Sequence, residues 1–204
     1  MSIVELETPF GPARAHLRPD SGDARAALVL GHGAGGGVDA PDLRAATRAA
    51  EAAGARVVLV EQPYRVAGRR SAAPAAQLDA AWIAVIAELR AGPLRSLPLV
   101  TGGRSSGARV ACRTAAVTGA DGVLCLAFPL RPPGREVSRL DELKQVSVPV
   151  LVVQGRSDPF GMPRSSGSRT VVRVPGDHSL RAGLAEVEQA VSSWLSGRLV
   201  ASET

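Results

Sequence analysis

One short segment constrains the fold of this chain more than any other. Residues 99–102 read as a short apolar strand, residues 103–107 read Gly-Arg-Ser-Ser-Gly, and small residues typical of a helix follow as far as Thr118. A buried strand that enters a tight glycine turn and leaves it as a helix belongs to a parallel sheet. Such a turn holds its central serine above the sheet, with the hydroxyl projecting. The segment therefore predicts a parallel sheet and a nucleophile at Ser105.

The rest of the chain alternates between strands and helices, as a parallel sheet requires. Two edge strands are expected first, and continuous apolar runs typical of strands buried on both faces follow. Strands are expected near residues 3–7, 13–18, 26–30, 56–60, 98–102, 122–127, 148–154 and 169–174. Helices are expected near residues 41–53, 75–90, 106–118 and 139–145 and from about 180 onwards, with a loop over 64–74. We predict an α/β fold with a doubly wound, mainly parallel sheet of about seven or eight strands and helices on both faces.

Length and spacing predict one compact unit. We expect residues 1–197 to form a single domain and residues 198–204 to fray at the C-terminus. Between the strands at 122–127 and 148–154 there is room for one short helix only, so no cap domain is expected. The substrate pocket should therefore be open and shallow.

Composition argues against several kinds of partner. The net charge is +5, but aromatic residues make up only 3%, which leaves little material for stacking on bases. No apolar run reaches the ~18 residues that a membrane helix requires, and we find no secretory signal. Cys112 and Cys125 read as small buried side chains without metal-ligand spacing. We expect a cytoplasmic protein that binds neither nucleic acid nor membrane.

Three residues in a fixed chain order fit a catalytic triad. Ser105 needs an adjacent base, and the base needs an orienting acid. His178 precedes the final helix, whereas the other two histidines come before the serine. Asp158 lies just after the strand at 148–154, where open α/β sheets place their sites. Asp158 could instead cap a turn, and Asp177 is a rival acid, although it adjoins His178 in sequence.

An oxyanion hole needs two backbone donors. We expect one from Ser106, at the first turn of a helix, and the other from Ala34, with Gly35 as second choice. The glycines of residues 33–37 would let this backbone approach a ligand closely. The spacing of glycines over residues 31–36 also fits Gly-x-Gly-x-x-Gly, so a dinucleotide-binding loop is kept as an alternative.

Several further residues are given roles by position. His32 is expected to hold its loop through a ring hydrogen bond, Asp39 to cap the helix starting near residue 41, and Arg104 to shield the turn or pair with an acid. Arginines on loops at the expected site could favour anionic substrates, or could form an ordinary surface. They are Arg65, Arg69, Arg70, Arg131 and Arg135. The predicted substrate contacts are Arg65, Arg69, Arg70, Phe128, Leu130 and Phe160.

Four segments together resemble a known family, and the resemblance covers nearly the whole chain. They are His32-Gly33-Ala34-Gly35-Gly36, Gly103-Arg104-Ser105-Ser106-Gly107, Pro129-Leu130-Arg131-Pro132-Pro133-Gly134 and Gln154-Gly155-Arg156-Ser157-Asp158-Pro159-Phe160-Gly161. The chain resembles the α/β-hydrolase superfamily. Within it, the chain looks like a small lidless branch with the testis-expressed hydrolase-like proteins and a domain of an NSL chromatin-complex subunit. In size it is similar to dienelactone hydrolases. The resemblance implies a triad of Ser105, Asp158 and His178, but supplies no substrate.

The expected function is hydrolysis of a small ester or thioester through an acyl-enzyme on Ser105. The mechanism calls for no metal ion and no organic cofactor, and the expected partner is a small-molecule substrate bound by a monomer or a homodimer. Some eukaryotic relatives act as scaffolds, so a non-catalytic binding protein on the same fold is kept as the alternative.

Overall fold

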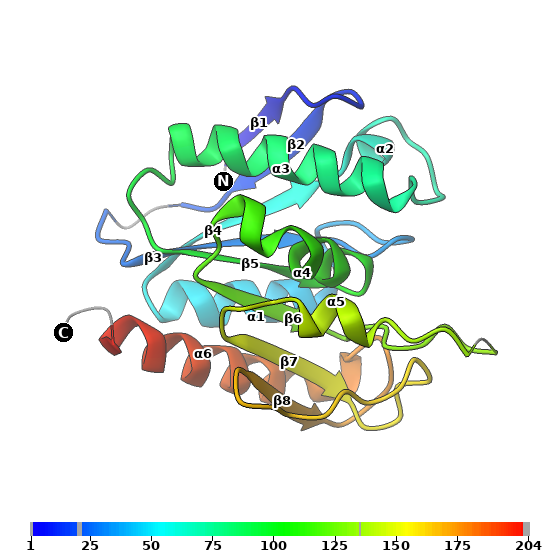
Figure 1. Cartoon of the computed structure of the whole chain (residues 1–204). Helices are drawn as coiled ribbons and strands as arrows, with labels where there is room; N and C mark the ends of the chain where they lie inside the picture. Colours follow the sequence, from blue (N-terminus) through cyan, green and yellow to red (C-terminus); the bar gives the residue numbers. More distant parts are fainter. Residues whose placement is uncertain (1, 20–21, 135, 202–204) are drawn as a thin grey trace.

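The computed structural model describes residues 2–19, 22–134 and 136–201. Eight strands form one sheet in the order β1-β2-β4-β3-β5-β6-β7-β8. Strands β3 to β8 run parallel, and the hairpin β1–β2 adds two antiparallel strands at one edge. This confirms the predicted mainly parallel sheet, and the parallel strands of Figure 1 point to one side of the molecule.

The elements follow the predicted alternation closely. The strands are β1 (Ser2–Leu6), β2 (Ala13–Leu17), β3 (Ala26–Gly31), β4 (Ala55–Glu61), β5 (Leu99–Arg104), β6 (Gly122–Leu126), β7 (Val150–Gly155) and β8 (Arg169–Val174). The helices are α1 (Pro41–Ala52), α2 (Pro63–Val66), α3 (Ala75–Ala91), α4 (Ser106–Thr118), α5 (Leu140–Lys144), the 3₁₀ helix η1 (Arg181–Gly183) and α6 (Leu184–Ala201).

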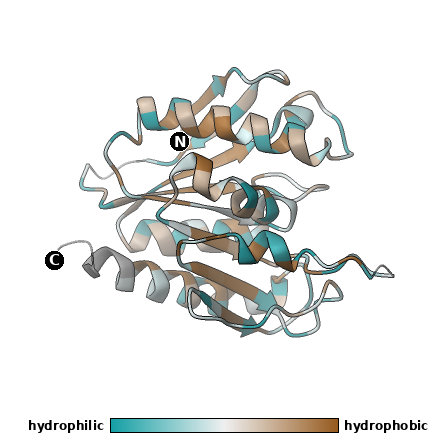
Figure 2. Ribbon diagram, in the orientation of Figure 1, coloured by the Kyte–Doolittle hydropathy of each residue, from teal (hydrophilic) through white to brown (hydrophobic). Residues whose placement is uncertain are grey.

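The central strands are apolar because both of their faces are covered. In β3, Leu28 and Leu30 belong to the core on the side of α1 and α6, while Ala27 and Val29 belong to the core on the side of α3. Strand side chains alternate between faces, so a run without polar residues fills both layers at once. Figure 2 shows these strands as the most hydrophobic part of the fold. Helices therefore lie on both faces, as predicted.

The structure corrects the prediction in two connections. The expected loop over 64–74 begins with the short helix α2, because Pro63 at its first turn has a backbone already set for a helix. The last helix does not start near Leu180. This residue has a left-handed backbone (φ 55°), η1 follows, and α6 begins at Leu184. Helix α6 runs to Ala201, into the segment expected to fray, and residues 202–204 lie outside the described residues.

No cap domain interrupts the connection from β6 to β7. Its described residues contain one short helix, α5, as the spacing predicted. The loops that follow β5 and β7 therefore lie at the carboxyl ends of these strands without a cap domain over them. In the described ranges, no helix combines the length and apolarity needed to cross a bilayer. Cys112 and Cys125 are buried and unbridged, with their sulfur atoms 3.5 Å apart.

Candidate active site

Ser105 lies on a sharp turn between β5 and α4. Its backbone has φ 52° and ψ −106°, a left-handed conformation that costs free energy in a non-glycine residue. The Ser105 N–H donates to the Leu126 carbonyl (2.9 Å), which ties the turn to the end of β6. Because the chain reverses so tightly, the Ser105 side chain is left partly exposed at the carboxyl edge of the sheet.

Two glycines make this turn sterically possible. A Cβ added to Gly107 would press on the Gly31 carbonyl oxygen and lie 2.6 Å from its carbon, and one added to Gly103 would lie 2.9 Å from the Gly107 carbonyl carbon. Only residues without a side chain fit here, so the ends of β3 and β5 approach the first turn of α4 directly. The Gly-x-Ser-x-Gly pattern is thus a packing requirement of the turn.

The three side chains singled out by chain order meet at this edge. The His178 Nε2 atom lies 2.9 Å from Ser105 Oγ, and its Nδ1 atom lies 2.8 Å from Asp158 Oδ2. With Nδ1 donating to the carboxylate, Nε2 is free to accept the serine proton. The arrangement can therefore remove a proton from the Ser105 hydroxyl and stabilise the resulting imidazolium.

Asp158 is fixed more firmly than its partners. Its side chain is fully buried, and it accepts hydrogen bonds from Gln154 Nε2 (2.8 Å) and from the Phe160 N–H (2.8 Å) in addition to His178. A buried carboxylate needs such donors to remain charged. The rival acid, Asp177, is exposed and bonds to Ser179, and its pKa is lowered by the Ser179 hydroxyl and N–H. The structure brings Asp158, not Asp177, to the imidazole.

Arg104 links the turn to the loop that bears His178. Its guanidinium donates to the His178 carbonyl oxygen (3.0 Å), and its Nε atom lies 2.9 Å from an oxygen of Asp42 at the start of α1. The prediction that Arg104 pairs with an acid is thus confirmed. Burial raises the pKa of the Asp42 carboxyl, and the nearby Arg104 charge opposes that shift. Arg104 therefore holds the histidine loop against the serine turn.

The glycine loop after β3 lies beside the serine. A Cβ on Gly33 would be 3.7 Å from the Ser105 Cβ, and Gly33 to Gly36 form a turn with a hydrogen bond of 3.2 Å. Ala34 and Gly35 occupy its two central positions. Tyr64 donates from its hydroxyl to the Ala34 carbonyl (2.9 Å), which fixes that peptide. Because α1 begins only at Pro41, this loop does not open directly into a helix, as a dinucleotide-binding loop would.

The chain matches the family model described as "Alpha/beta hydrolase domain" over residues 24–186. The chain belongs to the alpha/beta hydrolase family. No curated protein sequence matches it. The narrower resemblance to the testis-expressed and NSL-subunit branch stays a prediction.

Solved structures of hydrolases share this fold over nearly their whole length. XC6422 from Xanthomonas campestris, a serine hydrolase without a lid, is 22% identical with a TM-score of 0.75, covering 94% of this chain and 92% of its own. Est1E from Butyrivibrio proteoclasticus is 14% identical with a TM-score of 0.80, covering 98% and 100%. Dienelactone hydrolase from Anabaena variabilis is 19% identical with a TM-score of 0.75, covering 96% of each chain. These likenesses show the alpha/beta hydrolase fold without a lid.

His32 holds the glycine loop of this hydrolase fold in the way that the sequence predicted. Its Nδ1 atom lies 2.8 Å from the Gly33 carbonyl oxygen, and its Nε2 atom accepts the Gln62 N–H (3.1 Å). These two bonds need the neutral ring with its proton on Nδ1. Burial lowers the pKa of His32 below its ordinary 6.5, which fits this geometry.

A pH dependence follows from His32. The unfolded chain takes up a proton on this ring below about pH 6.5, and the folded chain does so only at lower pH. The free energy of unfolding should therefore fall as pH drops from 7.5 to 5.5, by at most about 1.4 kcal/mol per pH unit from this group. His32→Gln should remove this part of the slope in urea unfolding experiments. Equal slopes for the variant and the wild type would contradict the assignment.

The three apolar residues predicted to contact substrate lie in different surroundings. Phe160 lies at the triad, with its ring centre 4.2 Å from that of His178. Phe128 is wrong as a contact, because its ring is fully buried just after β6, together with Leu143 and Val146. Leu130 lies behind Gly161, within 3.7 Å of a Cβ placed there.

The described arginines of the predicted set are divided between the β4–α3 connection and the β6–α5 connection. Arg65 is half-buried on α2 and donates to the Arg69 carbonyl (3.3 Å), while Arg69 lines a small pocket between Tyr64 of α2 and Gln77 of α3. Arg70 is exposed in the following loop. Arg131 lies on the β6–α5 connection, and Arg135 lies outside the described residues. Their role toward substrate stays a prediction.

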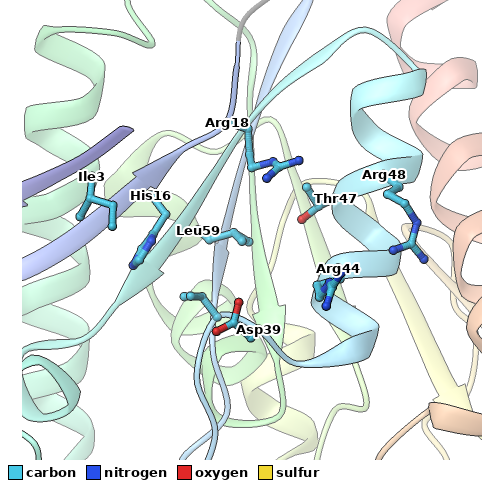
Figure 3. A pocket seen from close by; sticks show the side chains of 9 residues that line it. Ile3, His16, Arg18, Asp39, Arg44, Thr47, Arg48 and Leu59 are labelled. Carbon is cyan, nitrogen blue, oxygen red and sulfur yellow. The ribbon is translucent and has the colours of Figure 1, made fainter. Parts of the chain in front are cut away.

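A pocket of about 500 Å³ lies apart from the triad, between the β1–β2 hairpin and α1 (Figure 3). Its lining includes His16, Asp39 and Arg44, and none of the three triad residues.

Asp39 therefore faces this pocket, and the prediction that it caps α1 is wrong. The residue before α1 is Ala40, which makes no side-chain cap, and Pro41 begins the helix. His16 bonds to Glu61 (2.8 Å).

Two supporting residues were not assigned these contacts from the sequence. Gln154 is fully buried, and its Nε2 atom also lies within hydrogen-bonding distance of the Phe128 and Gly161 carbonyls (3.0 and 2.9 Å). It thus ties the Asp158 turn to β7. The second is Asp42, the partner of Arg104. Gln154 could have been noticed as a polar residue inside an apolar strand. Asp42 offered no such signal, because an acidic residue in the first turn of a helix is common.

Proposed function

We propose that this protein is a serine hydrolase that cleaves a small ester or thioester through Ser105. One observation carries the proposal: an unbroken chain of hydrogen bonds from Ser105 Oγ through His178 to the buried Asp158 carboxylate. A serine hydroxyl is a weak nucleophile alone and becomes effective when a base of this kind adjoins it.

The reaction proceeds in two halves. Ser105 Oγ attacks the carbonyl carbon while His178 Nε2 takes the hydroxyl proton, and the imidazolium is stabilised by Asp158. As the tetrahedral intermediate collapses, the bond to the leaving group breaks and His178 returns the proton to the departing alcohol or thiol. Water, activated by His178 in turn, then attacks the acyl-enzyme and releases the acid.

Two backbone donors are assigned to the developing oxyanion. Ser106 is the first residue of α4, so its N–H has no carbonyl one helical turn earlier, and the helix dipole favours negative charge there. The second donor is the Ala34 N–H, with Gly35 as the alternative, from the turn that lies against Ser105. Preorganised donors of this kind lower the barrier by several kcal/mol.

The substrate class rests on the open edge of the fold. The short β6–β7 connection leaves no cap to enclose a long acyl chain. Among the structural neighbours are a dienelactone hydrolase and Est1E, for which a structure with bound ferulic acid exists. Small carboxylic esters and thioesters are therefore the substrates proposed for this chain.

A substrate panel tests the proposal. Purified protein should hydrolyse short p-nitrophenyl esters faster than long-chain ones, with short acyl-CoA thioesters as the comparison. Arg69→Ala combined with Arg70→Ala should weaken any preference for anionic over neutral esters. Turnover that persists in Ser105→Ala would come from another source. A folded wild type that turns over no member of the panel would favour the non-catalytic binding protein instead.

A further inference from the structure

A second pocket lies behind the Asp158 turn. It has a volume of about 370 Å³ and is bounded by the β6–α5 connection and by the loop between β7 and β8. Apolar side chains, among them Leu130, Leu140 and Met162, form part of its wall. Three arginines, Arg131, Arg164 and Arg169, complete it, and none of the described residues in its lining is acidic.

Arg169 is the unusual member of this pocket. The residue is only 8% exposed, and its Nε donates to the Arg164 carbonyl (2.8 Å). Within the described ranges it forms no ion pair with a carboxylate. Another partly buried arginine, Arg113, is paired with both Asp79 and Glu142. An arginine that is largely withdrawn from water without an anionic partner is costly, so Arg169 should favour an anion that enters the pocket.

The neighbouring charges add to that preference. Arg131 and Arg164 are exposed, and neither forms an ion pair with another described residue. Three positive charges around one apolar pocket, with no acid among the lining side chains, attract a negative group through their combined field. A planar guanidinium group can also donate two hydrogen bonds to two oxygens of a carboxylate or a phosphate.

We propose that this pocket binds a small anion, a carboxylate or phosphate carried on an apolar group. The anionic oxygens would meet Arg169 together with Arg131 and Arg164, and the apolar part would lie against Leu130 and Met162. The pocket adjoins the active site from behind, because Gly161 in its lining follows Phe160, whose ring packs on His178. The Arg131 N–H also donates to the Phe160 carbonyl (2.8 Å).

Binding of phenyl phosphate, measured by titration calorimetry, tests the proposal without relying on catalysis. The wild type should bind it, and Arg131→Gln with Arg164→Gln should weaken the affinity by about tenfold or more, as expected for lost charge-assisted bonds. The matched control is Arg90→Gln with Arg95→Gln, which removes the same charge from exposed positions in the last turn of α3 and in the turn that follows it, and should leave the affinity unchanged. Absence of binding, or an equal loss in the control, would overturn the proposal.

Arg169→Leu provides an independent variant. Replacing an unpaired buried charge with an apolar side chain should leave the melting temperature of the free protein equal or higher. In the same variant, phenyl phosphate should no longer raise the melting temperature as it does in the wild type. A variant that still gains the wild-type stabilisation from phenyl phosphate would contradict a role for Arg169.

The ligand could be part of the substrate or a separate molecule. If turnover of a neutral ester is found, competitive inhibition by phenyl phosphate would indicate an anionic part of the substrate, and a changed kcat with constant KM would indicate a separate ligand. If the ester is not hydrolysed at all, the calorimetric comparison still decides whether the pocket binds anions. Failure of the proposed function and failure of this pocket are thus distinguished.

Discussion

Ser105→Ala is expected to lower kcat for a short p-nitrophenyl ester by about ten-thousand-fold or more. The variant keeps the turn and the oxyanion donors but has no oxygen to form the acyl-enzyme. His178→Ala should cause a loss of similar size, because without the base the Ser105 hydroxyl is a weak nucleophile. The double variant should be little worse than either single one, since the two residues act as a unit.

Variants of two aspartates test whether Asp158 or Asp177 is the acid of the triad. Asp158→Asn should lower kcat by about ten-thousand-fold, because an amide in this position favours the wrong imidazole tautomer. Asp177→Asn should keep nearly full activity, as this exposed carboxylate bonds to Ser179 and not to the ring. A large loss in Asp177→Asn, with Asp158→Asn near wild type, would reverse the assignment.

The neighbouring serine supplies a matched control for the nucleophile. Ser106→Ala removes the same hydroxyl one residue later and keeps the backbone N–H that is assigned to the oxyanion. Its kcat should stay close to that of the wild type. Steady-state kinetics of the variants, each checked for folding by circular dichroism, measures these effects. Equal losses in Ser105→Ala and Ser106→Ala would contradict the assigned roles.

Gly107→Ala is expected to destabilise the fold by about 3 kcal/mol, the largest stability effect that we predict. The added methyl group would press on the Gly31 backbone, which cannot give way like the end of a flexible side chain. The ends of β3 and β5 would have to separate from α4. Because the same contacts position Ser105, activity should fall together with stability.

Gly197→Ala is the matched control for this substitution. Gly197 lies in α6 with open space around its Cα, so the same methyl group should stabilise the helix by up to about 1 kcal/mol. Urea unfolding followed by circular dichroism compares the midpoints of both variants with that of the wild type. A Gly107→Ala midpoint equal to that of the wild type would show that the tight approach at the turn is not needed.

Much of the fold could be predicted because its signals are local. Residues 26–30 and 150–153 are apolar without interruption, which marks strands covered on both faces. The turn at Ser105 was recognisable because its glycines are dictated by contacts that no other residue permits. The order of Ser105, Asp158 and His178 reflects where loops leave a parallel sheet, so sequence alone identified three side chains that the structure brings into contact.

What the sequence missed depends on contacts between distant residues. Nothing near Arg104, at the end of β5, indicates that its charge meets Asp42, which lies in α1. Phe128 follows a strand next to the site, and its burial is decided by packing against α5. The start of the last helix was misplaced because the left-handed backbone at Leu180 has no glycine to signal it. The unpaired charge of Arg169 likewise becomes visible only when its surroundings are known.

The most direct test of the central claim is covalent labelling by a fluorophosphonate probe. Such a probe reacts with a serine only when a base activates it, and intact-mass analysis followed by peptide mapping locates the adduct. The wild type should gain one probe mass on Ser105, and Ser105→Ala should gain none. A well-folded wild type that stays unlabelled, or a label on any other residue, would contradict an activated nucleophile at this turn.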